Sequence, residues 1–166
     1  MCKSLMTLHI LELIQKSLHE VVKRSDKINT PDDFLLSESG MILLDSICMK
    51  LSAIGESIKN LDKITNHELL SQYSEIPWKN VMGVRDYIVH HYFDVDADII
   101  FNICKEEVPA LSSVINRMIE DLQQKLLSTF NYQLLTNKRL STINCLKTIN
   151  YQLIYNYQLI VAHYKI

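Results

Sequence analysis

Apolar residues recur at helical spacing through most of the first 127 positions of the sequence. Residues 4–23 present one largely apolar face, formed by Ile10, Leu13, Ile14, Ser17, Leu18 and Val21. The segment from about 38 to 60 has the strongest periodicity, carried by Met41, Leu44, Cys48, Leu51, Gly55 and Ile58. Gly55 lies on this face, although glycine lowers the stability of a helix interior by about 1 kcal/mol relative to alanine. We therefore expect a neighbouring helix to approach closely at Gly55.

Local signals mark where further helices begin. Thr30 is a candidate N-cap, with Pro31 in the first helical position and two acids in the first turn. Other helices are expected over residues 66–73, from Trp78 to about Tyr92, from Asp96 or Asp98 to Glu107, and from Pro109 through Leu126. No strand pattern competes with these helices before residue 128. The pattern predicts an all-α fold, an antiparallel bundle of about five to six helices.

Composition supports one helical domain over residues 1–127. The chain has 166 residues, of which 48% are apolar, and only three Gly and three Pro with which to form tight turns. Residues 1–127 hold all nineteen Asp and Glu and thirteen of the Lys and Arg, a formal charge of about −6. Such an acidic body argues against binding nucleic acid through a broad basic face.

The C-terminal part of the sequence has a different character. Residues 128–166 contain four basic residues, no acid, Gly or Pro, and three copies of Asn-Tyr-Gln-Leu. Repeats this short do not define a solenoid unit. We expect a low-complexity, Asn/Tyr-rich extension outside the functional domain, either helical or poorly ordered.

Cysteine usage and hydropathy bear on the compartment. The cysteines lie far apart without a Cys-x-x-Cys pair, as expected for unpaired thiols in a reducing compartment: Cys2, Cys48, Cys104 and Cys145. The N-terminus lacks the pattern of a secretion signal, and no apolar run approaches the roughly 18 residues of a membrane span. We therefore expect a cytoplasmic protein without membrane association.

The residues best suited to chemistry lie on the helix predicted from Trp78. Arg85 falls within the apolar stripe of this helix, and a buried guanidinium needs an anion or an interface that stays wet. Asp86 lies four residues before His90, a spacing that lets the carboxylate orient the imidazole and raise its pKa. Arg85 and His90 lie about 140° apart around a helix. Within one chain their side chains therefore diverge, unless the helix ends or distorts near His90.

Structural roles compete with catalytic ones for these residues. Arg and His on a helix most often form salt bridges or caps, and His90 and His91 near a helix C-terminus can complement the helix dipole. Asp94, Asp96 and Asp98 have the alternating spacing of a calcium loop, but the glycine and the final glutamate of an EF-hand are missing. The only support for a metal site formed by these aspartates and the two histidines is their closeness in the sequence. We therefore assign no metal site.

A short motif and its surroundings resemble a known family. Residues 85–92 read Arg-Asp-Tyr-Ile-Val-His-His-Tyr and fit the pattern R-x-x-x-x-H-x-Y. The surroundings are Ile54-Gly55-Glu56 in the long second helix, Ile76-Pro77-Trp78-Lys79 before the motif, and His91-Tyr92-Phe93-Asp94-Val95-Asp96 across its end. Together they resemble the HepT-like toxins of the HEPN superfamily, over about residues 5–126.

This resemblance implies a metal-independent ribonuclease without a cofactor, working as a homodimer in which the motif helices of two copies meet at a cleft. Arg85 would bind the scissile phosphate and His90 would move a proton, with Asp86 and His91 in support. The resemblance further implies a toxin that cleaves tRNA or mRNA. Its antitoxin, a minimal nucleotidyltransferase, would inactivate it by transferring AMP to Tyr92, which adds bulk and negative charge.

Two alternatives stay open. One is a catalytically inactive helical binding partner or scaffold for a nucleotidyltransferase, which suits the acidic body but leaves the complete set of Arg85, His90 and Tyr92 unexplained. The other is a purely structural bundle in which the motif forms a salt-bridged interface. In that case the loss of Arg85 harms folding, whereas in a ribonuclease it abolishes cleavage and leaves the fold intact.

Overall fold

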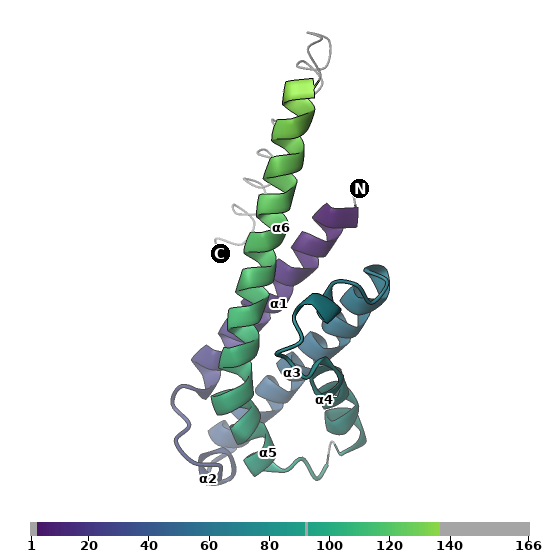
Figure 1. The fold of residues 1–166 in the computed structure, drawn as a ribbon. Helices are drawn as coiled ribbons and strands as arrows, with labels where there is room; N and C mark the ends of the chain where they lie inside the picture. The colour runs from purple at the N-terminus through teal and green to yellow at the C-terminus, as the bar shows by residue number, and fades with distance from the viewer. Residues whose placement is uncertain (1–2, 92, 137–166) are drawn as a thin grey trace. The chain divides into compact units, whose positions relative to one another are not determined.

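The structure, a computed structural model, describes residues 3–91 and 93–136, and it contains helices and no strand within them (Figure 1). The elements are α1 (Lys3–Ser25), α2 (Asp32–Leu35), α3 (Glu38–Ile64), the 3-10 helix η1 (Leu70–Gln72), α4 (Trp78–His90), α5 (Ala97–Asn102), the π-helix η2 (Ile103–Glu107) and α6 (Val108–Thr136). The all-α prediction is confirmed. The chain divides into two compact units, Met1–Gln124 and Lys125–Ile166. The predicted domain boundary after residue 127 stays a prediction.

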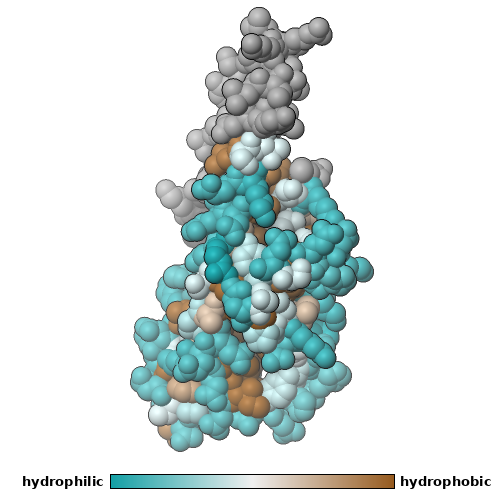
Figure 2. All heavy atoms as spheres, viewed as in Figure 1, coloured by the Kyte–Doolittle hydropathy of each residue, from teal (hydrophilic) through white to brown (hydrophobic). Residues whose placement is uncertain are grey.

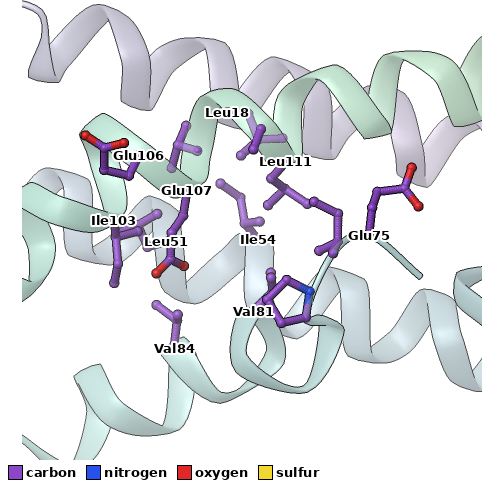
Figure 3. A pocket seen from close by; sticks show the side chains of 14 residues that line it. Leu18, Leu51, Ile54, Glu75, Val81, Val84, Ile103, Glu106, Glu107 and Leu111 are labelled. Atoms are coloured by element: carbon purple, nitrogen blue, oxygen red, sulfur yellow. The ribbon is translucent and has the colours of Figure 1, made fainter. Parts of the chain in front are cut away.

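The core of the first unit forms where α1 packs along α3. The largest fully buried side chains come from α1, α2, α3, α5 and α6: Leu11, Ile14, Leu18, Phe34, Ile47, Ile58, Leu61, Ile100, Ile115 and Met118. Burying each such apolar side chain contributes roughly 1.5–3 kcal/mol. Hydrophilic residues cover most of the face seen in Figure 2. Beside the core, α1, α3 and α4 line an apolar pocket (Figure 3).

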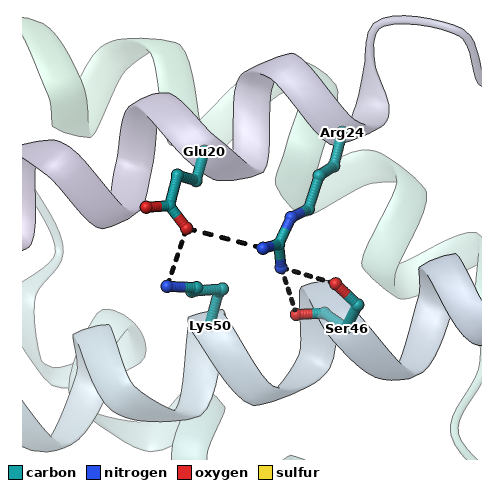
Figure 4. A network of polar contacts seen from close by, with 4 residues as sticks. All are labelled: Glu20, Arg24, Ser46 and Lys50. Atoms are coloured by element: carbon teal, nitrogen blue, oxygen red, sulfur yellow. Dashed lines mark hydrogen bonds and ion pairs between the residues drawn. The ribbon is translucent and has the colours of Figure 1, made fainter. Parts of the chain in front are cut away.

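Four polar residues join α1 to α3 beside this core (Figure 4). The Glu20 carboxylate forms ion pairs with Lys50 at 2.7 Å and with Arg24 at 3.5 Å. Arg24 also donates hydrogen bonds to the carbonyl and hydroxyl oxygens of Ser46. The hydrogen bond from Lys50 lowers the pKa of Glu20. Because these charged side chains are about one third exposed, they add little stability, but they fix how α1 lies along α3.

The start of α2 differs from the prediction that Thr30 caps it. No side-chain hydrogen bond caps this helix, and Pro31, just before it, already has helical backbone angles. Instead the Asp33 carboxylate reaches back and accepts hydrogen bonds from the backbone N–H groups of Asn29 (2.7 Å) and Thr30 (3.0 Å). These bonds lower the pKa of Asp33. The acid in the first turn therefore fixes the entry to α2.

The helix predicted over residues 66–73 is wrong for most of its length, because only Leu70–Gln72 is helical. Asn66 and His67 have φ angles of 55° and 63°, in the left-handed region that a right-handed helix cannot contain. Ring atom Nδ1 of His67 lies 2.6 Å from a carboxylate oxygen of Asp62. This contact ties the turn to the end of α3.

The two helices predicted on either side of Pro109 are one uninterrupted helical run. Asp96 caps its start by accepting a hydrogen bond from the backbone N–H of Asp98, which settles the choice between these two acids. The run then passes through the π turn of η2, where the N–H of Val108 donates to the carbonyl of Ile103, five residues earlier. A proline ring clashes with the carbonyl four residues before it in a regular α-helix. The wider turn relieves this clash, so the helix continues through Pro109.

Gly40 lets α2 rest directly on the first turn of α3. A Cβ atom at position 40 would overlap the carbonyl oxygen of Asp33 and lie 2.8 Å from the carbonyl oxygen of Phe34. Both obstacles are backbone atoms, which cannot rotate away. A side chain at this position would therefore separate α2 from α3, whereas a Cβ at Gly83 in α4 would meet no atom within 4 Å.

We predict opposite effects for the same substitution at these two glycines. Gly40→Ala lowers the free energy of unfolding by about 1–3 kcal/mol because it forces a backbone clash. Gly83→Ala raises it by about 0.5–1 kcal/mol because alanine favours a helix and has room. Denaturant unfolding followed by circular dichroism measures both. Equal effects at the two positions would contradict the contact between Gly40 and α2.

Candidate active site

Helix α4 lies against α3 at Gly55, as the sequence predicts. A Cβ at position 55 would lie 3.1 Å from the carbonyl oxygen of Val81 and 3.3 Å from the Cβ of Arg85. The prediction of a close approach at Gly55 is confirmed. The start of α4 is anchored as well, because the indole N–H of Trp78 donates to the carbonyl of Tyr73 at 2.8 Å. These contacts set the position of the Arg85 backbone relative to α3.

The Arg85 side chain lies at a half-exposed edge of α4, between two carboxylates. Its Nη1 donates a 2.7 Å hydrogen bond to Asp86, and its Nε lies 3.7 Å from a carboxylate oxygen of Glu56 on α3. The hydrogen bond to Asp86 raises the pKa of Arg85. The expectation of a guanidinium buried in an apolar stripe is wrong, because the side chain is 42% exposed. The expectation that Arg85 needs an anion holds, and two acids of the same chain supply it.

Asp86 binds Arg85, whereas the i to i+4 spacing predicts that it orients His90. Its shortest contact is the 2.7 Å bond to the guanidinium, and this bond is the main cause of its lowered pKa. The charge of His90 is the weakest of the causes acting on Asp86. No hydrogen bond joins Asp86 to His90. The sequence prediction is therefore corrected: within one chain, the Asp86 carboxylate positions the Arg85 guanidinium.

Helix α4 ends at His90, and His91 caps it. The backbone N–H of His91 and its ring Nδ1 lie 3.0 and 2.9 Å from the carbonyl oxygen of Tyr87. The aromatic rings of Tyr87 and His91 stack, with their centroids 4.9 Å apart. His91 therefore supports the end of the motif helix, and the exposed His90 is its last residue. Because the chain is helical from Arg85 to His90, the side chains of these two residues point in directions about 140° apart around the helix axis.

The segment after α4 is tied back to it. The hydroxyl oxygen of Tyr87 accepts a hydrogen bond from the backbone N–H of Asp96 at 3.3 Å, next to the start of α5. The predicted modification site, Tyr92, lies outside the described residues.

Within the described part of the chain, no three His, Cys, Asp or Glu side chains gather closely enough to hold a metal ion. None of the helices described there has the length and apolar composition needed to cross a membrane.

Comparison with known proteins connects this geometry to a family. The family model described as "Ribonuclease HepT-like" matches residues 10–118, which include all of α3, α4 and α5. The chain belongs to the HepT-like ribonuclease family. The resemblance inferred from the Arg85 to Tyr92 motif is thereby confirmed at the level of the family. No solved structure matches this chain.

Several relatives carry ribonuclease names. A Methanocaldococcus jannaschii protein named "Gamma-glutamylcyclotransferase and putative RNase" is 32% identical over 136 residues, 80% of this chain but only 56% of its own length. A second protein of that organism, named "Putative RNase", is 31% identical over 57% of this chain and 72% of its own length. The "Probable ribonuclease HepT" of Thermococcus cleftensis is 28% identical over 52% of this chain and 73% of its own length.

The candidate site includes two residues of α3 to which the sequence assigned no role. Glu56 forms the second ion pair of Arg85, and the positive charge of Lys59 contributes to the lowered pKa of Asp86. Both lie within four positions of Gly55, the contact point with α4. The expected close approach at Gly55 was the signal that could have found them, because residues one and four positions later flank the same contact.

The Arg85–Asp86 pair gives a prediction for the titration of Asp86. Its carboxyl should titrate below the ordinary aspartate pKa of about 3.9, and Arg85→Gln should raise that pKa by more than His90→Asn does. Carbon-13 NMR of the aspartate carboxyl groups measures each value. The lowered pKa means that the pair stabilises the folded state above about pH 3.9 and that this contribution is lost as the pH falls through the folded-state pKa. A larger shift in His90→Asn would restore the interpretation that Asp86 serves His90.

Proposed function

We propose that this chain is an endoribonuclease that cleaves RNA without a metal ion and acts as the toxin of a toxin–antitoxin pair. The observation that carries the proposal is the arrangement of Arg85 and His90 on α4. A guanidinium held by Asp86 and Glu56 lies on the same short helix as an exposed terminal histidine, in a chain of the HepT-like ribonuclease family. A phosphate-binding cation and a proton carrier are the two groups that RNA cleavage needs most.

RNA supplies its own nucleophile, so the protein needs only these two roles. The 2′-oxygen attacks the adjacent phosphorus and loses its proton, while the bond from phosphorus to the 5′-oxygen breaks and that oxygen gains a proton. The products are a 2′,3′-cyclic phosphate and a 5′-hydroxyl. His90 is suited to move one of these protons because its imidazole ring has one nitrogen that can donate a proton and one that can accept a proton.

Arg85 is suited to bind the scissile phosphate and to stabilise its added charge. Its guanidinium has five N–H donors, and the hydrogen bond to Asp86 occupies one of them. The two nearby carboxylates hold the group in place, and Nη2 makes no hydrogen bond with any described residue. A planar guanidinium that keeps donors available can bind two phosphate oxygens at once.

A homodimer resolves the divergence of Arg85 and His90 within one chain. If two α4 helices meet across a twofold axis, Arg85 of one copy faces His90 of the other. Exposed apolar residues on α3 and α4 support such an interface. Ile42 and Met49 are 62% and 71% exposed and lie on the same stripe of α3 as Glu56, while Val89, one turn after Arg85, is 52% exposed.

The antitoxin in this proposal is a minimal nucleotidyltransferase that transfers AMP from ATP to the hydroxyl of Tyr92, which loses its proton while pyrophosphate leaves. Tyr92 lies two residues after His90 in the sequence, so the modification adds bulk and negative charge beside the proposed cleft. That charge repels RNA phosphate. Mass spectrometry of the chain after incubation with such an enzyme and ATP tests the modification, with Tyr92→Phe as the unmodified control.

Cleavage should depend on Arg85 and His90 and not on a divalent metal. We predict that Arg85→Gln and His90→Asn each lower the cleavage rate by roughly 100-fold or more with an unchanged circular dichroism spectrum. The matched controls Arg117→Gln and His9→Asn should retain activity, because both side chains lie outside the motif. Cleavage should persist in EDTA and fail on substrate with 2′-deoxyribose. A strict metal requirement would contradict the mechanism, and variants that fold normally and cut normally would favour the scaffold function.

A mixing experiment tests the proposed dimer. Arg85→Gln and His90→Asn proteins, each inactive alone, are mixed and allowed to exchange subunits. If each site takes Arg85 from one copy and His90 from the other, half of the dimers are mixed and each has one intact site, so about one quarter of the activity returns. Light scattering measures the oligomeric state in parallel. No recovery despite confirmed exchange, or full activity of a monomer, would overturn the shared site.

A further inference from the structure

An apolar pocket of about 220 Å³ has Val81 and Val84 of α4 in its lining (Figure 3). None of Arg85, Asp86 and His90 lines it. Its apolar lining comes from α1, α3, α4, the loop before α4 and the run from η2 into α6: Leu18, Leu51, Ile54, Ile76, Pro77, Val81, Val84, Ile103, Val108, Ala110 and Leu111. The volume lies below the roughly 300–1,000 Å³ of pockets that hold drug-sized ligands. It therefore suits a smaller molecule.

The remaining lining residues are all glutamates. Glu106 and Glu107 lie at the end of the pocket near Ile103, and Glu75 lies at the opposite end (Figure 3). Glu75 forms an ion pair with Arg117, so its charge is balanced within the protein. Glu106 and Glu107 are exposed and form no ion pair with any described residue. One end of an apolar pocket thus holds two carboxylates that have no ion-pair partner among the described residues.

The π turn places these two acids at the pocket. Glu106 and Glu107 belong to η2, the single π-helical segment between α5 and α6. Single π turns within α-helices occur frequently at functional sites, because the extra residue costs stability. The π turn is an observation independent of the pocket and its charges. It marks the end of the pocket at which Glu106 and Glu107 lie as a candidate functional site.

We propose that this pocket binds a small ligand with an apolar body and one cationic head, an ammonium or a guanidinium group. The apolar body lies among Ile54, Val84 and Leu111, and the head lies at Glu106 and Glu107. The charge of the lining selects this ligand class, since no basic side chain is present to bind an anion. The small volume of the pocket favours a small molecule over a helix of a partner protein, because a helix needs an elongated groove.

A ligand in this pocket also contacts the motif helix. Val81 and Val84 belong to α4, and Arg85 directly follows Val84. Ile54 likewise directly precedes Gly55, on which α4 rests. A bound ligand therefore fills the space on one side of the α3–α4 contact. We expect binding to be visible at the Arg85 side chain as well as in the pocket.

Three six-carbon probes that differ in charge test the ligand class: n-hexylammonium, 1-hexanol and hexanoate. Methyl NMR spectra of the full chain are recorded at pH 7 while each probe is added. We expect n-hexylammonium to shift the methyl signals of Ile54, Val81, Val84 and Leu111 and to bind about fivefold more tightly than 1-hexanol, since exposed ion pairs give gains of this size. Hexanoate should bind more weakly than either.

Two variants locate the binding and one serves as a control. The double variant Glu106→Gln with Glu107→Gln should reduce n-hexylammonium affinity to that of 1-hexanol without changing 1-hexanol binding. Glu120→Gln, which removes an exposed acid of α6 outside the pocket, should change neither. Ala110→Trp should fill the pocket and abolish binding of both probes. The Gln variants keep the test valid if the tryptophan disturbs folding.

Several results would overturn the proposal. One is equal affinity for the three probes, and another is a preference for n-hexylammonium that survives the double Gln variant. Shifts confined to residues outside the pocket would do the same. Binding of a basic amphipathic peptide without binding of n-hexylammonium would assign the pocket to a protein partner.

Discussion

The site depends on the close contact between α3 and α4 at Gly55. Because this position has no side chain, the backbone of α4 rests on α3, with a hypothetical Cβ only 3.1 Å from the carbonyl of Val81. The contact brings Glu56 within ion-pair distance of Arg85 and keeps Lys59 near Asp86. The helix penalty of glycine, about 1 kcal/mol, is the cost of this arrangement. A side chain at position 55 would press the motif helix away from Glu56, the acid of α3 that pairs with its arginine.

The electrostatics of the site are local. The first 127 residues have a formal charge of about −6, so the body of the protein repels a polyanion such as RNA at long range. Two of those acids nevertheless hold Arg85 in a defined position. A protein of this charge gains selectivity, because a polyanion can approach only where cations are gathered. In the proposed dimer, the two Arg85 guanidinium groups come together at one cleft, beside the two His90 side chains.

Helical periodicity was sufficient to predict the main elements, because buried apolar side chains such as those of α1 and α3 repeat every three or four residues. It also predicted the contact at Gly55, because a glycine on a buried helix face lowers stability unless a second helix packs closely against it. Asn66 and His67 could not be predicted in the left-handed region, since their preceding residues continue the helical pattern of α3. The π turn was missed because no residue type in η2 distinguishes it from an α-helix.

The pairing within the candidate site was harder to predict than its residues. Adjacent positions on a helix do not normally face each other, so sequence spacing favoured Asp86 with His90 over Asp86 with Arg85. The long arginine side chain folds back along α4 and reaches its neighbour at 2.7 Å. Glu56, the other partner, lies 29 positions earlier and meets Arg85 only after α3 and α4 have packed. Side-chain reach and tertiary packing, which spacing does not encode, decide both pairs.

The π turn of η2 also has a consequence for the ancestry of the α5–α6 run. A π turn contains one residue more than an α turn, so it is equivalent to a single-residue insertion that the helix has retained. Each residue turns an α-helix by about 100°. Removing one residue from Ile103–Glu107 would therefore rotate α5 by about 100° relative to α6. This extra residue sets the rotation of α5 about the helix axis relative to α6. The buried side of each helix can therefore contact its own neighbours, although the two helices form one continuous run.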